Sequence, residues 1–261
     1  MGLAAAFGAY IIWGFLPLYL ILVQTVPAFE FVGWRIIWTL PLCLLIALFR
    51  KQGGELRAAL GNRRTVGWLA LSASLIAVNW VVYVWAIQTG EVYAASLGYY
   101  INPLVNVLLG TALLGERLTR PQWLAVGIAA VGVSLLAAGA VTTLWISLTL
   151  ALTFGTYGLI RKRVVVGSVP GLTIESLLLL LPSIGVVWYY AQTQGSSFAV
   201  STELSLSIML GGVLTAVPLL MFAIAARKLP YSMLGFIQFL APSIVFVLGL
   251  TVFGEELKHV Q

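Results

Sequence analysis

The sequence contains no aspartate, only one histidine and one cysteine, and charged residues make up just 8% of its 261 positions. Nucleophilic triads and histidine metal sites need clusters of these residue types, so both are unlikely interpretations. No glycine loop ending in Lys-Ser or Lys-Thr is present to bind the phosphates of ATP. A single cysteine, Cys43, excludes an internal disulfide. We therefore expect no catalytic residue, no metal and no cofactor.

Hydrophobic residues make up 61% of the chain, too many for a water-soluble domain of this length. A helix needs roughly 20 mostly apolar residues to cross the hydrocarbon core of a bilayer. The sequence divides into nine such segments separated by short polar breaks, which predicts an all-α polytopic membrane protein. The segments comprise residues 3–23, 29–49, 65–88, 92–114, 121–140, 144–160, 171–191, 205–226 and 230–253.

The basic residues are concentrated in alternate breaks. Twelve of the 14 Lys and Arg residues follow segments two, four, six and eight, whereas the remaining breaks contain only Lys258. By the positive-inside rule, this predicts a multi-pass protein of the cytoplasmic (inner) membrane with a cytoplasmic N-terminus. Topology thereby explains the net charge of +6. We expect the lipid bilayer, and not nucleic acid, as a partner.

Two stretches, residues 98–118 and 235–257, match each other. Each has a proline inside an apolar run, Pro103 or Pro242, which leaves the carbonyl of Tyr99 or Gln238 without its helical partner. Interrupted helices in corresponding halves of a membrane protein point to a binding site at the bilayer midplane. With the prolines aligned, the coinciding pairs are Gly110 with Gly249, Gly115 with Gly254, Glu116 with Glu255 and Leu118 with Leu257.

This repeat predicts two inverted five-helix units. Residues 1–141 form the first unit, and residues 142–261 form the second, which begins on the opposite side of the membrane. The second unit contains only four of the nine segments, so the tenth helix is missing from this chain. We interpret the sequence as incomplete and expect a tenth helix to follow.

Several polar and aromatic residues lie at membrane depth, where each is costly unless it faces a cavity or a partner. Tyr99, Asn102 and Asn106 recur at helical spacing and form one stripe on segment four. The alternative is that the aromatic residues belong to the core or the interfacial belt and that each amide satisfies a neighbouring helix. The candidate substrate-binding residues are Tyr10, Trp13, Asn79, Tyr83, Tyr99, Asn102, Tyr157 and Gln238.

Two ionisable residues, Arg35 and Glu175, lie inside predicted spans. Their backbones are separated by about 15 Å along the membrane normal, so a direct salt bridge between them is not expected. Arg35 can reach the outer surface, pair with Glu30 or Glu91, or contact a substrate. Glu175 can reach the inner surface or the basic cluster at residues 161–163, or take part in proton coupling.

Four stretches, residues 9–19, 79–110, 153–163 and 215–249, resemble the RarD group of EamA-type permeases in the drug/metabolite transporter superfamily. The resemblance implies a ten-helix fold of two inverted repeats that exports or exchanges small organic molecules. It also implies a central cavity formed by helices one, three, four, six, eight and nine. Trp34 stands where the family usually has histidine. The absent tenth helix leaves a homodimer as an open alternative.

Together these observations predict a secondary transporter of small organic solutes such as drugs, amino acids or related amphipathic metabolites. Export or exchange by alternating access fits, with Pro103 and Pro242 as kinks, and strong ion coupling is not required. The alternative is an integral membrane enzyme acting on a lipid-linked substrate, or a non-transporting sensor. Clustered acids or a soluble domain would favour this alternative, and the sequence has only scattered glutamates and short breaks.

Overall fold

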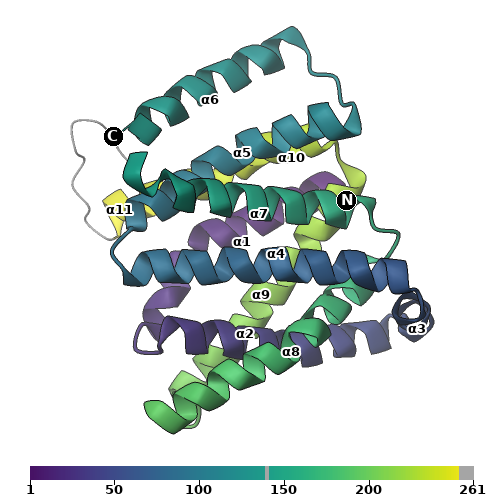
Figure 1. Cartoon of the computed structure of the whole chain (residues 1–261), viewed down its shortest axis with the longest axis vertical. Coiled ribbons are helices and arrows are strands. Elements are labelled where there is room, and N and C mark those ends of the chain that lie inside the picture. Colours follow the sequence, from purple (N-terminus) through teal and green to yellow (C-terminus); the bar gives the residue numbers. More distant parts are fainter. Residues whose placement is uncertain (139–140, 253–261) are drawn as a thin grey trace.

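The computed structural model describes residues 1–138 and 141–252, and in these ranges the regular elements are all helices. In chain order they are α1 (Gly2–Leu20), η1 (Ile21–Val23), α2 (Ala28–Phe49), α3 (Gly53–Gly61), α4 (Arg63–Gln88), α5 (Val92–Leu114), α6 (Arg120–Ala138), η2 (Val141–Thr143), α7 (Leu144–Arg163), α8 (Ser168–Thr193), α9 (Thr202–Lys228), α10 (Tyr231–Gln238) and α11 (Leu240–Thr251). The long helices run across the bundle in Figure 1.

The described helices confirm the all-α membrane class. Nine segments are long and apolar enough to cross a bilayer, and they coincide with the nine predicted segments to within a few residues. The short helix α3 was not predicted, because it lies in a polar break and only Ala59 of its residues is buried. The ninth segment is divided at Phe239 into α10 and α11.

The breaks rich in Lys and Arg gather at one end of the bundle, here called the basic end. The N-terminus and α3 lie there, at the right of Figure 1, and α11 lies near the opposite end. Helix α6 stands apart from the bundle and has no buried residue among those described. Its apolar side chains therefore face outward, as expected for a helix in contact with lipid.

At the basic end, cationic side chains bind the carbonyls that helices leave unpaired at their C-termini. Lys162 Nζ donates to the carbonyls of Ala226 at 2.9 Å and Leu229 at 2.5 Å, where α9 ends. Arg163 Nη2 donates to Leu113 O at 2.5 Å, where α5 ends. A positive charge at a helix C-terminus is also favourable to the helix dipole. These residues thus connect neighbouring helices in addition to setting the charge distribution.

Helix α5 lies between α7 and α10, and glycine permits the close approach on both sides. A Cβ atom on Gly98 would lie 3.0 Å from Cβ of Leu150 in α7. A Cβ on Gly235 in α10 would lie 2.7 Å from the carbonyl oxygen of Pro103, closer than real contacts allow. The crossing of α5 and α10 therefore brings backbone against backbone, as small residues permit in membrane helices.

The two proline segments, which the sequence pairs, differ in the structure. Helix α5 continues through Pro103 without a break, held on both sides by α7 and α10. The other copy is interrupted at Phe239, three residues before Pro242. Pro242 has no N–H to donate to the carbonyl of Gln238, which explains why the helix divides there.

Glu116 follows Gly115, which ends α5 in the left-handed conformation with φ 67°. Its carboxylate accepts hydrogen bonds from the backbone N–H groups of Tyr231 at 2.5 Å and Ser232 at 2.8 Å, and from Ser232 Oγ at 2.7 Å. These donors belong to the first turn of α10. Glu116 therefore caps α10 from the end of α5, whereas the residues matched to this pair in the repeat, Gly254 and Glu255, lie outside the described residues.

Burial raises the pKa of Glu116, but hydrogen bonds from Ser232 and Tyr231 and the charge of Lys162 outweigh it, so the pKa lies below its usual value. We expect Glu116→Gln to lower the free energy of unfolding in detergent by about 1 kcal/mol at neutral pH, because an amide binds helix N–H groups less strongly than a carboxylate. Thermal unfolding of both proteins measures this difference.

The same two proteins can also be compared at acid pH. Because the folded-state pKa is depressed, the contribution of Glu116 is present above the unfolded-state pKa of about 4.3 and is lost as pH falls through the folded-state value. The stability gap between wild type and Glu116→Gln should therefore close in acid. Glu203→Gln, an exposed change in the first turn of α9, is the matched control. A gap that stays constant with pH would contradict the capping role.

Candidate functional site

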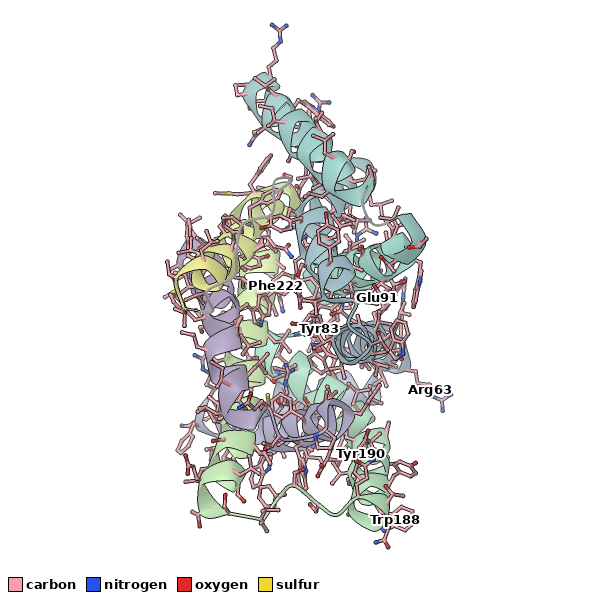
Figure 2. All side chains as sticks on the ribbon, turned by 90° about the vertical axis from the view of Figure 1, so that its left-hand side faces the viewer. Arg63, Tyr83, Glu91, Trp188, Tyr190 and Phe222 are labelled. Atoms are coloured by element: carbon pink, nitrogen blue, oxygen red, sulfur yellow. The ribbon has the colours of Figure 1, made fainter. Side chains whose placement is uncertain are left out.

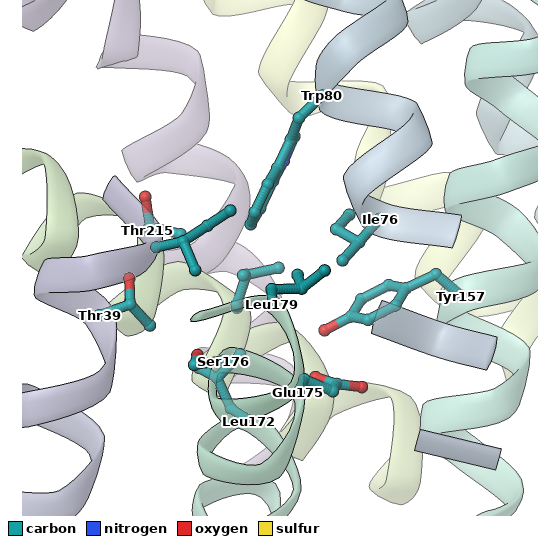
Figure 3. Close-up of a pocket in the computed structure, with 11 residues that line it drawn as sticks. Thr39, Ile76, Trp80, Tyr157, Leu172, Glu175, Ser176, Leu179 and Thr215 are labelled. Carbon is teal, nitrogen blue, oxygen red and sulfur yellow. The ribbon is translucent and has the colours of Figure 1, made fainter. Parts of the chain in front are cut away.

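A small cavity lies in the middle of the bundle. Helices α2, α4, α7, α8 and α9 contribute to its wall. Its lining residues are Ile36, Thr39, Ile76, Trp80, Tyr157, Leu172, Glu175, Ser176, Leu179, Thr215 and Leu219. In Figure 3 the Trp80 ring projects into the cavity from one side. Thr39 and Thr215 lie on a second side, and Tyr157 and Glu175 lie on a third. The wall is mainly apolar with a few polar groups.

Glu175 is the acidic group of this wall and is only 2% exposed. Ser72 donates a hydrogen bond to its Oε1, and Arg161 Nη1 lies 3.6 Å from the same oxygen. The Tyr157 hydroxyl is turned towards it in Figure 3. The other carboxylate oxygen, Oε2, is buried without a hydrogen-bond partner, as are Nε and Nη1 of Arg161. Glu175 thus reaches the predicted basic cluster, and the pair connects α7, α8 and α4 near the basic end.

Arg35 lies towards the opposite end of the bundle, seven residues after the start of α2 or roughly 10 Å along the helix. Its Nε donates to Thr215 Oγ1 at 2.8 Å. The guanidinium carbon lies 5.1 Å from the centre of the Trp80 ring and 5.5 Å from that of Phe31. No acidic group forms a salt bridge with Arg35 among the described residues. The predicted alternative of pairing with Glu30 or Glu91 is therefore wrong.

Glu30 is fully buried and binds groups other than Arg35. It accepts hydrogen bonds from Trp34 Nε1 at 3.1 Å, and from the backbone N–H and hydroxyl of Ser197 at 2.9 and 2.6 Å. Trp34, the residue at the position of the family histidine, also stacks on Phe198 at 4.6 Å between ring centres. These contacts connect the start of α2 to the loop before α9, which explains why Glu30 is not available to Arg35.

Three polar side chains from different helices meet beside the crossing of α5 and α10. Asn106 Nδ2 donates to Gln238 Oε1 at 2.6 Å, and the Tyr10 hydroxyl lies 3.5 Å from the same oxygen. All three are buried. The structure thus brings together two predicted site residues, Tyr10 and Gln238, through Asn106 of the predicted stripe. Buried amides that satisfy each other between membrane helices mainly stabilise packing.

A cluster of aromatic rings fills the centre of the bundle. Phe222 of α9 lies 5.8 Å from Trp13 and stacks on Tyr157 at 6.2 Å and 15°, and Phe154 completes the group. In Figure 2, which shows the bundle from the opposite end, Phe222 and Tyr83 lie towards the middle, whereas Trp188 and Arg63 lie at the rim. Phe222 was not among the predicted site residues.

The remaining predicted residues lie apart from this cluster. Tyr83 and Tyr99 pack edge to face at 5.6 Å, on the side of Arg35. Asn79 donates to Leu150 O at 2.8 Å and to the Thr153 hydroxyl at 3.0 Å, both in α7, so it satisfies a neighbouring helix. The side-chain oxygen of Asn102 is buried without a hydrogen-bond partner.

Of the predicted site residues, only Tyr157 and Glu175 contribute to the wall of the central cavity. Thr39, Ser176 and Thr215 were missed. In the sequence they appear only as small hydroxyl residues at membrane depth. Ser and Thr at this depth often bond to a carbonyl of their own helix, so such residues do not by themselves indicate a cavity.

Comparison with known proteins supports a transporter. A sequence model described as the EamA-like transporter family matches residues 1–138. An uncharacterized transporter of Pseudomonas aeruginosa is 46% identical over 95% of this chain and 84% of its own length. Protein RarD of Streptomyces exfoliatus is 42% identical over 98% of this chain and 82% of its own, and Protein RarD of Escherichia coli is 38% identical over 98% and 86%.

A solved structure titled only as a crystal structure of a protein has the same fold. It superposes with a TM-score of 0.77, covers 99% of this chain and 91% of its own, and is 19% identical in sequence. At this identity the likeness concerns the fold alone.

We expect Glu175→Gln to lower the free energy of unfolding by roughly 3–5 kcal/mol, because it leaves the Arg161 charge buried without a counter-ion. Arg161→Met should have a similar effect. The double variant Arg161→Met/Glu175→Gln should recover most of the loss, since no uncompensated charge remains. Denaturant unfolding of the four proteins in detergent measures the coupling.

Arg64→Met, an exposed change at the basic end, is the control and should alter stability by less than about 0.5 kcal/mol. Strictly additive losses in the double variant would contradict a coupled pair.

Proposed function

Because the chain belongs to the EamA-like transporter family, we propose that this membrane transporter moves small organic solutes by alternating access, as an exporter or exchanger. The observation that carries the proposal is the mainly apolar cavity in the middle of the bundle, with its few polar groups. Its wall takes Thr39 and Trp80 from the first half of the chain and Glu175, Ser176 and Thr215 from the second. A site between two halves changes its access when the halves rock.

We propose further that the halves are inverted repeats of residues 1–141 and 142–261, and helix packing supports this division. The packing of α1 on α9 corresponds to that of α7 on α4, and α2 on α9 corresponds to α8 on α4. The packing of α5 on α7 corresponds to that of α10 and α11 on α1. Two further contacts, α2 with α8 and α5 with α10, join a helix of one half to its own counterpart in the other half. A two-fold axis in the membrane plane produces this set of pairs.

One departure from this symmetry suggests how access changes. Helices α7 and α9 pack together around Tyr157 and Phe222, whereas the corresponding helices α1 and α4 have no comparable contact between their described residues. Tyr157 and Phe222 lie about six residues from the helix ends at the basic end and are at most 1% exposed. Tyr99, towards the opposite end, is 42% exposed. We propose that the described state is closed at the basic end, and that transport exchanges the α7–α9 contact for one between α1 and α4.

We place the basic end, and with it the N-terminus, in the cytoplasm of a cell with an inner membrane, because cytoplasmic breaks carry the excess of Lys and Arg. The closed state then faces outward. The Arg161–Glu175 pair lies on the cytoplasmic side of the cavity, and we propose that it holds α7 against α8 while this side is closed. Among the predicted substrate-binding residues, we place Tyr83 and Tyr99 on the route from the outer side to the cavity, and we assign Asn79 to helix packing.

Counterflow in proteoliposomes tests the proposed function. Vesicles containing the purified protein are loaded with an unlabelled solute from a panel of amino acids, aromatic acids, amines and neutral aromatic compounds, and uptake of the same labelled solute is followed. We expect transient tracer accumulation above that of protein-free vesicles for at least one solute. Folded protein that exchanges no member of the panel would contradict the proposal.

Thiol labelling tests alternating access at the cavity itself. With Cys43 replaced by alanine the chain has no other cysteine, so Ser176→Cys introduces a single thiol into the cavity wall. We expect a membrane-impermeant maleimide to react with it from the outer side, and a solute that is exchanged in counterflow to slow the reaction.

Ser183→Cys is the matched control, since Ser183 lies on the same helix and is equally buried at 4% exposure, but is not among the residues that line the cavity. It should stay unlabelled until the protein is denatured. Equal labelling of both positions, or no effect of an exchanged solute at position 176, would argue against the cavity as the transport site.

A further inference from the structure

We propose that the transported solute is a small organic monoanion with a carboxylate and a planar apolar body, and that Arg35 binds the carboxylate. This inference rests on the proposed function and names the substrate class of that site. Its basis is a guanidinium that the protein positions on several sides and leaves without a counter-ion.

The position of Arg35 is set by α9 and by its own helix. Thr215 accepts from Nε at 2.8 Å, and Thr39 donates to the Arg35 carbonyl at 2.8 Å and lies 3.2 Å from Gly212 O. A Cβ atom on Gly211 would lie 3.1 Å from Cγ of Arg35, so glycine is needed for this approach. A side chain held at its Nε and its stem is preorganised to present the two terminal nitrogens.

Those terminal nitrogens, Nη1 and Nη2, donate to no protein group among the described residues. The acids that could neutralise the charge are used elsewhere: Glu30 binds Trp34 and Ser197, and Glu175 lies beside Arg161. The guanidinium is instead surrounded by aromatic faces and the hydroxyl groups of tyrosines. An arginine at this depth is costly without a partner, so the site is complementary to an anion.

The chemistry of the surroundings selects the kind of anion. Arg35 is the one base in the walls of the central cavity and of a second, narrow cavity next to it, as far as the structure describes them. A single guanidinium matches a monoanion, and its fork binds the two oxygens of a carboxylate. Thr215 lines both cavities, so Arg35 stands where they meet.

The apolar body of the solute has two aromatic surfaces beside it. Trp80 reaches from Arg35 into the central cavity, and Phe31 lines the second one. An aromatic ring stacks on such surfaces while its carboxylate meets the guanidinium.

Ligand-induced thermal stabilisation of the detergent-purified protein tests the assignment. The probes are phenylacetate and indole-3-acetate, their neutral amides, the cation 2-phenylethylamine, and inorganic phosphate. We expect the two carboxylates to raise Tm in a concentration-dependent way and the other probes to have little effect. Arg35→Gln should weaken carboxylate binding roughly tenfold or more, because the charge-assisted pair is lost, and Arg35→Lys should weaken it less.

A purely structural role of Arg35 can be distinguished by the Tm of the protein without ligand. If Arg35 served packing, Arg35→Gln would lower Tm without ligand, whereas removal of an unpaired cation should leave Tm unchanged or raise it. Arg64→Gln is the control for the loss of a positive charge and should leave carboxylate binding intact.

Three results would overturn the proposal: amides binding as tightly as carboxylates, Arg35→Gln retaining carboxylate affinity, or no response to either carboxylate. Counterflow separates this failure from failure of the proposed function. If neutral or cationic solutes are exchanged, and Arg35→Gln exchanges them as well, the protein is a carrier of another substrate class. If nothing is exchanged, the transport proposal itself fails.

Discussion

A polar group in a lipid bilayer must be satisfied by protein or by a hydrated cavity, because hydrocarbon offers it no hydrogen bond. Several polar side chains of this bundle meet that constraint by pairing across helices. Asn79 binds α7, Asn106 binds Gln238, and the cations at the basic end bind helix C-termini. The interhelical polar contacts and the glycine crossings together fix which helices are neighbours, and the central cavity is the space that they leave.

Against this background two cationic residues near the central cavity, Arg35 and Arg161, differ. Arg161 has Glu175 as a counter-ion, although at 3.6 Å and with unused donors on the arginine. Arg35 has a hydroxyl and two aromatic faces and no acid in the described part of the chain. A buried pair of moderate geometry can separate more readily than one with every hydrogen bond made. An unpaired guanidinium beside empty space is what a site for an anion requires. The cavity thus has a neutralised charge towards the basic end and an available one towards the other.

The asymmetry between corresponding helix pairs relates this arrangement to movement. Helices that correspond under the proposed repeat have nearly the same neighbours, and this is the basis for the proposed exchange of conformations between the halves. In the proposed mechanism, the aromatic contact between α7 and α9 closes one end, while the corresponding helices α1 and α4 make no comparable contact between their described residues. The close approach of Gly235 to the carbonyl of Pro103 at the α5–α10 crossing would keep the proposed halves in contact during such a movement.

The amino-acid sequence by itself determined the membrane class, the nine spanning segments and the alternation of charge, because these depend on local composition and on distance along the chain. It also identified most groups that are costly at membrane depth. Only the tertiary structure decided their partners: Glu175 with Arg161, Glu30 with Ser197, and Asn79 with α7. A partner depends on the rotation of each helix and on neighbours more than a hundred residues away, which periodicity within one segment does not encode. For this reason Arg35 could be found from the sequence, and its lack of a counter-ion could not.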